Sequence, residues 1–200
     1  GFFSGYVTVF KDGDLYRMYY RGLPDAGKDG SEVETTCYAK SFDGIQWEKP
    51  NLGLFEVMGT KENNAILKGA YPHSHNFSPF LDTRPDCPSD QRYKALAGIS
   101  QSGLVAFVSG DGLRWRKLRE TAVIAEKAPF KFSWMFDSQN VGFWSEAERK
   151  YVCYFRVWEG VRRIGRTESS DFVNWSDPVL MSQMTDGQPS PTEDLYTNQT

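Results

Sequence analysis

Residues 35–47 read TTCYAKSFDGIQW: a strand-like run, an Asp-Gly turn and a tryptophan. Similar sequences recur at residues 104–115 (LVAFVSGDGLRW) and 163–175 (RIGRTESSDFVNW). The tryptophans that end the three elements are 68 and 60 residues apart. Self-similarity at a roughly fixed period is the sequence signature of a repeat architecture, so the chain is expected to consist of repeated structural units.

A pair of strand-like runs precedes each of these elements. Residues 5–22 read GYVTVFKDGDLYRMYYRG, and the central Asp-Gly is a strong hairpin signal because glycine accepts a positive φ. Residues 76–98 and 140–156 have the same form. No stretch of ten or more residues shows a helical period. The sequence therefore predicts an all-β chain built from β-propeller blades of three or four strands.

The repeat also suggests approximate boundaries within a single, partial propeller domain covering residues 1–200. About three blades are expected, with the beginning of another. Their approximate limits are 1–70, 71–135, 136–190 and 191–200.

The aspartates of the repeated turn are expected to be structural. Asp43, Asp111 and Asp171 each lie a few residues before the marker tryptophan. An aspartate in such a turn accepts hydrogen bonds from backbone amides two or three residues on. The tryptophan is then expected to pack between neighbouring blades.

Composition excludes some classes of partner. The net charge is -3, and no run of Lys or Arg exceeds two residues, so the basic footprint of a nucleic-acid-binding protein is absent. No apolar stretch approaches the ~18 residues of a membrane helix. We therefore expect no nucleic acid and no membrane as a partner.

The cysteines give little information. Cys37, Cys87 and Cys153 are odd in number, far apart and without CxxC spacing, so neither a disulfide framework nor a zinc site is indicated. No cofactor is expected. No signal peptide is visible and the compartment stays open, with a secreted or periplasmic location favoured over a cytoplasmic one.

Two stretches carry a resemblance to a known superfamily. Residues 38–50 (YAKSFDGIQWEKP) and residues 136–144 (FDSQNVGFW), followed by residues 150–156 (KYVCYFR), resemble five-bladed β-propeller glycoside hydrolases. That superfamily includes invertases, levansucrases, arabinanases and β-xylosidases. The resemblance is closest to uncharacterised bacterial proteins with an invertase-like N-terminal domain. It implies a carbohydrate substrate and a site at a central funnel.

The sequence also departs from the superfamily. The Asn-Asp-Pro-Asn-Gly, Arg-Asp-Pro and Glu-Cys motifs of invertases are absent, and Phe77-Ser78-Pro79 stands at the place resembling Arg-Asp-Pro. A non-catalytic carbohydrate-binding propeller therefore remains an alternative to a glycosidase acting on a plant or algal-type oligosaccharide. A glycoside phosphorylase of the same fold is a further alternative and would need a phosphate site near Arg156 or His75.

In this architecture the start of each blade's innermost strand lines the funnel. Polar residues stand at these starts, where burial is costly unless a ligand or water satisfies them. Trp134 could stack on a pyranose, and Arg156 could reach an anionic group. The candidate substrate-binding residues are His73, His75, Asn76, Trp134, Gln139, Asn140, Arg156 and Asp194.

Two of the carboxylates at these starts are the catalytic candidates. Hydrolysis of a glycosidic bond typically needs two carboxyl groups, one on each side of the bond. Asp137 is expected to be the acid/base or the stabiliser of the transition state, and Glu193 the general acid. The alternative, purely structural roles are that Asp137 caps a loop and that Glu193 lies on a solvated turn.

Two further interpretations concern single segments. His73 and His75 form an H-x-H pair that, in a strand, would place both rings on one face, for a metal or for sugar hydroxyls. No third ligand is evident, so contact with substrate is favoured and no metal is expected. Asp82 and Asp86 lie in a turn-rich loop and are expected to be solvated.

Overall fold

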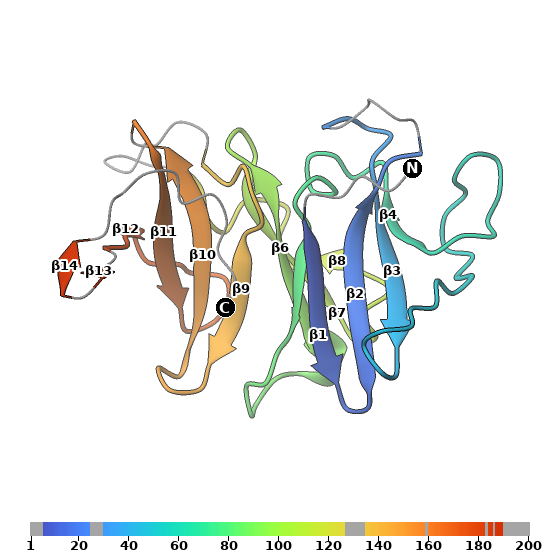
Figure 1. Ribbon diagram of the computed structural model, residues 1–200, viewed down its shortest axis with the longest axis horizontal. Helices are drawn as coiled ribbons and strands as arrows, with labels where there is room; N and C mark the ends of the chain where they lie inside the picture. Colours follow the sequence, from blue (N-terminus) through green and yellow to red (C-terminus); the bar gives the residue numbers. More distant parts are fainter. Residues whose placement is uncertain are drawn as a thin grey trace.

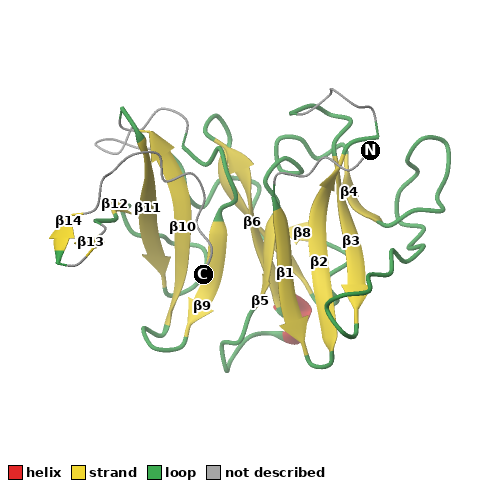
Figure 2. Ribbon diagram, viewed as in Figure 1, coloured by secondary structure: helices red, strands yellow, loops and turns green. Residues whose placement is uncertain are grey.

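The computed structural model of the protein describes residues 6–24, 30–126, 135–158, 160–182, 184–185 and 187–189. Three antiparallel four-stranded sheets dominate this part of the chain and lie side by side (Figure 1). Figure 2 shows a short helical turn, η1 (Ser89–Gln91), among the strands. We call the three sheets blades 1, 2 and 3.

Each blade is a meander in which consecutive strands are neighbours. Blade 1 consists of β1 (Val7–Asp12), β2 (Leu15–Gly22), β3 (Thr35–Ser41) and β4 (Ala65–Lys68). Blade 2 consists of β5 (Ser78–Leu81), β6 (Tyr93–Ile99), β7 (Gly103–Ser109) and β8 (Arg116–Lys117). Blade 3 consists of β9 (Val141–Ser145), β10 (Lys150–Trp158), β11 (Arg162–Ser169) and β12 (Val179–Leu180). A separate short hairpin pairs β13 (Met184–Thr185) with β14 (Gln188–Pro189).

The first strands of the blades adjoin one another. β5 contacts β1 on one side and β9 on the other, so these three strands form the inner edge of the assembly. Each of them begins at one end of its blade and turns back into the next strand at the other end. We call these the opening end and the hairpin end.

Aromatic side chains fill the space between blades. One core cluster, which includes Tyr19 and Phe107, joins blades 1 and 2, and a second, which includes Leu96 and Tyr151, joins blades 2 and 3. Burial of such large apolar side chains is the main favourable contribution to folding. Packing between neighbouring sheets therefore holds the three blades together.

The repeated aspartate turns have the predicted geometry. Asp43 Oδ1 accepts hydrogen bonds from the backbone N–H groups of Ile45 and Gln46, both at 2.8 Å. Asp111 and Asp171 make the same pair of contacts in blades 2 and 3. The structural role expected of these three aspartates is confirmed.

The marker tryptophan of blade 2 also behaves as expected. Trp115 donates from Nε1 to the carbonyl oxygen of Gly112 at 3.1 Å and meets Tyr19 of blade 1 edge-on, with ring centroids 6.3 Å apart. The turn allows this close approach because Gly112 has a φ of 75°, and a Cβ there would lie 2.7 Å from the Tyr19 hydroxyl. The turn thus sets the contact between two blades.

The expectation that Asp82 is solvated is wrong. Its side chain is fully buried, 2.6 Å from Lys94 Nζ and 2.7 Å from the Tyr151 hydroxyl, which donates to it. The loop that follows β5 folds back over the junction of blades 2 and 3, and this could not be read from its turn-rich composition. Asp86, in the same loop, is exposed as expected.

Candidate functional site

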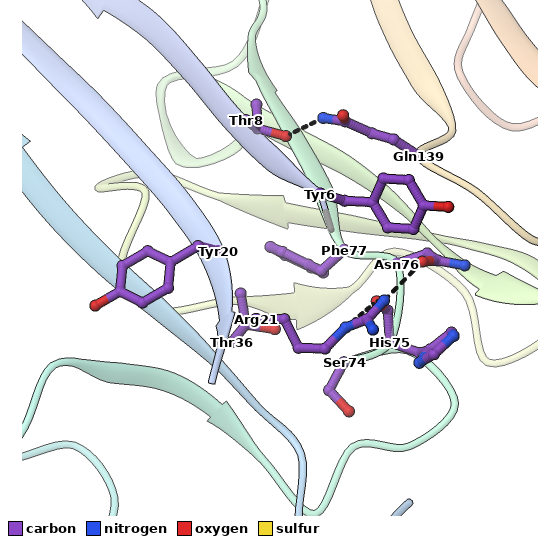
Figure 3. A pocket seen from close by; sticks show the side chains of 10 residues that line it. All are labelled: Tyr6, Thr8, Tyr20, Arg21, Thr36, Ser74, His75, Asn76, Phe77 and Gln139. Atoms are coloured by element: carbon purple, nitrogen blue, oxygen red, sulfur yellow. Dashed lines mark hydrogen bonds between the residues drawn. The ribbon is translucent and has the colours of Figure 1, made fainter. Parts of the chain in front are cut away.

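The opening ends of the three blades converge. The register of the three hairpins is set by one tyrosine in each second strand. These tyrosines pair with first-strand residues as follows: Tyr16 with Lys11, Tyr93 with Leu81 and Tyr151 with Trp144. Counting back five residues from the first-strand partners brings Tyr6, Asn76 and Gln139 to corresponding positions. Figure 3 shows these three side chains around one small region.

Gln139 links the first strands of blades 1 and 3. Its Nε2 donates to Thr8 Oγ1 at 2.6 Å and to the Val7 carbonyl oxygen at 3.4 Å (Figure 3). Gln139 is only 7% exposed. Gln139 was predicted to bind substrate, and in the structure its amide nitrogen donates to β1.

Two asparagines hold the segment that carries Asp137. Asn76 Nδ2 and Asn140 Nδ2 both donate to the carbonyl oxygen of Phe136, at 3.1 and 3.3 Å. Phe136 itself has a φ of 64°, and its N–H donates to the Arg156 carbonyl oxygen at 3.0 Å. Both asparagines are buried, so they act as fixed hydrogen-bond donors that place Asp137 next to the opening of blade 2.

Asp137 forms an ion pair with Arg156 of β10. The Asp137 side chain is 49% exposed, whereas that of Arg156 is 5% exposed. A buried guanidinium next to a half-exposed carboxylate fixes the orientation of that carboxylate while leaving one side of it open to solvent. The sequence predicted that Arg156 could reach an anionic group, and in the structure that group is the carboxylate of Asp137.

Arg21 occupies the position in blade 1 that corresponds to Arg156 in blade 3. It donates from Nε to the His75 carbonyl oxygen at 2.9 Å and from Nη2 to Asn76 Oδ1 at 3.1 Å (Figure 3). Its Nε also lies 3.8 Å from Glu34 Oε1. Arg21 therefore ties the edge of blade 1 to the opening of blade 2.

Glu34 is a component of the site that sequence reasoning missed. Its side chain is fully buried, with Oε1 3.0 Å from His75 Nδ1 and accepting from the Gly30 N–H at 2.6 Å. Glu34 stands just before β3, whereas most of the predicted site residues stand at the starts of innermost strands. Glu32 lies two residues earlier and the strand that follows contains Thr35, Thr36 and Lys40, so no local sequence signal set Glu34 apart.

A narrow cavity lies among these groups. It has room for one water molecule, whose centre could move within a volume of about 10 Å³. Its lining includes Arg21, Thr36, Ser74 and His75. The hydroxyl oxygens of Thr36 and Ser74 are buried and have no hydrogen-bond partner among the described residues. A sugar ring cannot enter this cavity, so a carbohydrate would bind at its rim.

The prediction that His73 and His75 share one face of a strand is wrong. Residues 71–76 form turns, in which side chains do not alternate with period two. The His73 ring packs edge-on against Phe107, with centroids 5.5 Å apart, whereas His75 contacts Glu34. Burial, followed by the charge of Lys117, lowers the pKa of His73 below its usual value.

Some predicted site residues lie outside the part that the structure describes, namely Trp134, Glu193 and Asp194. Within the described ranges, no three His, Cys, Asp or Glu side chains gather in a way that could hold a metal ion. The same ranges contain no helix long and apolar enough to span a membrane.

Comparison with known proteins begins with sequence. No family model matches the chain. The uncharacterized proteins Rv1502 (strain ATCC 25618 / H37Rv) and MT1551 (strain CDC 1551 / Oshkosh) of Mycobacterium tuberculosis are each 25% identical over 118 residues. The match covers 58% of this chain and 35% of each relative, so the chain spans about a third of the length of these relatives.

Solved structures show a clear similarity in fold. An N-acetylgalactosamine deacetylase from F. plautii matches with a TM-score of 0.58 and 14% identity, over 92% of this chain and 52% of that one. A fructofuranosidase from Schwanniomyces occidentalis matches with a TM-score of 0.57 and 18% identity, over 86% and 32%. A thermostable family-43 glycoside hydrolase gives 0.53 and 13%, over 92% and 54%.

These similarities establish the fold class. The chain is all-β and contributes about three blades of the propeller fold that several glycoside hydrolases adopt, as the sequence predicted. At such low identity the likeness concerns the fold alone, and the same fold carries different functions in different proteins. The chemistry has to be argued from the side chains at the opening end.

Proposed function

We propose that this protein is a glycoside hydrolase acting on a plant or algal-type oligosaccharide, with Asp137 as a catalytic carboxylate. The observation that carries the proposal is the ion pair between half-exposed Asp137 and buried Arg156 at the opening end. A carboxylate oriented in this way suits a role in which it acts ionised: as a base on water, as a nucleophile or as a stabiliser of the oxocarbenium-like transition state.

The surroundings of Asp137 favour an uncharged, hydroxyl-rich ligand. Arg156 pairs with Asp137 and Arg21 lies beside Glu34, so these four charges balance. Amide groups at the same end, such as that of Asn76, suit the donors and acceptors of sugar hydroxyls. The balance of charge also disfavours the phosphorylase alternative, because phosphate would have to displace a carboxylate from an arginine.

The proposal is tested by Asp137→Asn in the full-length protein. This change keeps the shape of the side chain and removes its charge, so we expect turnover of aryl glycosides and oligosaccharides to fall by ~10²-fold or more, as when a positioned acid or base is lost. The melting temperature should barely change, because the side chain is half-exposed. Asp86→Asn, at an exposed aspartate of the hairpin end, is the matched control and should retain full turnover.

A non-catalytic carbohydrate-binding propeller is the second candidate. The observation in its favour is that Ser74, at the position in blade 2 that corresponds to Asp137, is not a carboxylate. The general acid that the sequence suggested, Glu193, lies outside the described residues. In this case calorimetry would detect oligosaccharide binding without product, and Asp137→Asn would alter affinity only modestly. Equal turnover with Asn at this position would refute the assignment of Asp137.

A further inference from the structure

We propose that His75, held by Glu34, is the general acid of this site and donates the proton that the leaving oxygen requires. The inference rests on the proposed glycoside hydrolysis and assigns the second group that this reaction needs. From sequence, His75 was expected to contact substrate, and Glu34 had no assigned role. The structure brings the two into direct contact at the opening end.

The first argument is the orientation of the ring. Glu34 lies 3.0 Å from Nδ1 of His75 through Oε1 and 3.3 Å through Oε2. This contact fixes a proton on Nδ1 and directs the other nitrogen, Nε2, away from the carboxylate. Among the described residues, none hydrogen-bonds to Nε2 of His75. The side chain is 15% exposed, so the ring is held but still accessible.

The second argument is the electrostatic surroundings of the ring. A fully buried carboxylate next to an imidazole compensates the positive charge that the ring carries when both nitrogens hold a proton. Arg21 of β2 is the opposing charge, because its Nε lies 3.8 Å from the same carboxylate. Tyr71 is a further titratable neighbour, with its ring centroid 6.4 Å from that of His75, and Tyr6 and Tyr20 line the same cavity. The Glu34 carboxylate therefore lies between the Arg21 guanidinium and the His75 ring.

The third argument is the water-sized cavity. Buried hydroxyls without a partner, here those of Thr36 and Ser74, are costly unless a water molecule satisfies them. His75 belongs to the lining of the same cavity. A water molecule between these hydroxyls would give the imidazole a route for recovering a proton from solvent after each turnover.

The fourth argument is the position relative to Asp137. Asn76 follows His75 in the chain, and its side chain donates to the carbonyl of Phe136, the residue before Asp137, at 3.1 Å. A single hydrogen bond thus connects the two segments that carry the proposed acid and the proposed carboxylate. Groups on neighbouring blade openings can flank a glycosidic bond bound at the rim.

The proton balance of the step is complete. Nε2–H of His75 gives its proton to the glycosidic oxygen as the bond between that oxygen and the anomeric carbon breaks. A water molecule adds to the anomeric carbon, and Asp137 accepts its proton. Return of one proton from Asp137 to solvent and of one from solvent to His75 restores both groups. Glu34 keeps its charge throughout and acts as a positioning residue.

The test uses the full-length protein and two leaving groups on one sugar. 2,4-Dinitrophenyl glycosides need little help from an acid, whereas phenyl glycosides need a proton. We expect His75→Gln to lower turnover of the phenyl glycoside by ~10²-fold or more, with much less effect on the dinitrophenyl glycoside. Glu34→Gln should show the same selectivity to a smaller degree. Glu62→Gln, at an exposed glutamate of blade 1, is the control for Glu34→Gln.

The outcomes separate the two proposals. Full turnover by Asp137→Asn would overturn the proposed function. If that variant is inactive, while His75→Gln hydrolyses both glycosides normally or loses both equally, the acid assignment is wrong and the proposed function stands. The selective pattern in Glu193→Gln, with a normal pattern in His75→Gln, would transfer the role of the acid to Glu193.

A spectroscopic measurement covers the case in which a variant at buried Glu34 fails to fold. The chain has two histidines, so His73→Gln assigns the imidazole ¹⁵N signals of His75. We expect the neutral imidazole of His75 to be the Nδ1–H tautomer, because Nδ1 faces the Glu34 carboxylate. A neutral ring that carries its proton on Nε2 would overturn the proposal.

Discussion

At the hairpin end of blades 1 and 2 one network of charged residues occurs twice, whereas at the opening end corresponding positions carry different residues. In the network, an aspartate at the end of the first strand or directly after it meets a basic residue of the second strand and a tyrosine of the next blade. Its members are Asp12, Arg17 and Tyr93 at one junction and Asp82, Lys94 and Tyr151 at the other. A charge that recurs with the repeat serves the architecture that all blades share.

At the opening end the repeat is broken. Arg21, Gly98 and Arg156 hold corresponding positions in β2, β6 and β10, but Arg21 binds the opening of the next blade and Arg156 binds Asp137 of its own. Propeller architecture does not require this asymmetry. Charged residues that depart from the repeat are therefore the ones to examine for function.

The largest expected effect is on stability at the hairpin end. Burial alone would raise the pKa of Asp82, but its hydrogen bonds with Lys94 and Tyr151 outweigh burial and lower it. Asp82→Ala leaves the Lys94 ammonium, 2% exposed, without its counter-ion. We expect the free energy of unfolding to fall by about 3–5 kcal/mol, the typical cost of breaking a buried pair from one side.

Urea titration of this variant at neutral pH measures the loss. The double variant Asp82→Leu with Lys94→Met removes both charges and should recover most of the stability, because no charge is then left buried and unpaired. A loss below about 1 kcal/mol in Asp82→Ala would show that the network is not structural. The lowered pKa fixes the sign of the pH dependence: the contribution of Asp82 is present above its unfolded-state pKa and is lost as pH falls through the folded one.

The intermediate effect compares the two arginines at the opening end. Arg21→Met removes the donor to the His75 carbonyl oxygen and to Asn76 Oδ1, and it removes the guanidinium 3.8 Å from buried Glu34. We expect it to lower the free energy of unfolding by about 1–3 kcal/mol, the cost of buried polar groups left unsatisfied. Arg156→Met leaves no buried anion unpaired, because Asp137 is half-exposed. It should therefore mainly lower turnover. Thermal unfolding and aryl-glycoside hydrolysis, measured on both variants, would contradict the comparison if the two responded alike.

These contrasts also show what the sequence could and could not predict. The strands and the turn aspartates such as Asp111 depend on residues within a few positions of one another, and local patterns predicted them. Asp82 was misjudged because its partner Tyr151 lies 69 residues away, on another blade. Glu34 was missed because it acts from the start of a third strand, and its contact with His75 exists only once two blades are packed together.

The smallest expected effect concerns the repeated turn aspartates. Burial opposes ionisation of Asp171, but two backbone N–H donors and the side chains of Asn174 and Ser169 lower its pKa to about 2. Its carboxylate is exposed, so solvent screens these interactions and their contribution to stability is small. The lost hydrogen bonds resemble a lost helix cap, and Asp171→Ala should cost about 0.5–2 kcal/mol without changing affinity for oligosaccharide. Asp171→Asn keeps an acceptor for both backbone N–H groups and should lower the free energy of unfolding by only about a few tenths of a kcal/mol. Because the folded-state pKa is depressed, the carboxylate's contribution is present above pH ~4 and is lost as the pH falls toward about 2. The stability difference between the wild type and the asparagine variant should therefore shrink across that window in calorimetric scans. An alanine variant that is fully stable and yet inactive would move Asp171 from the architecture to the site.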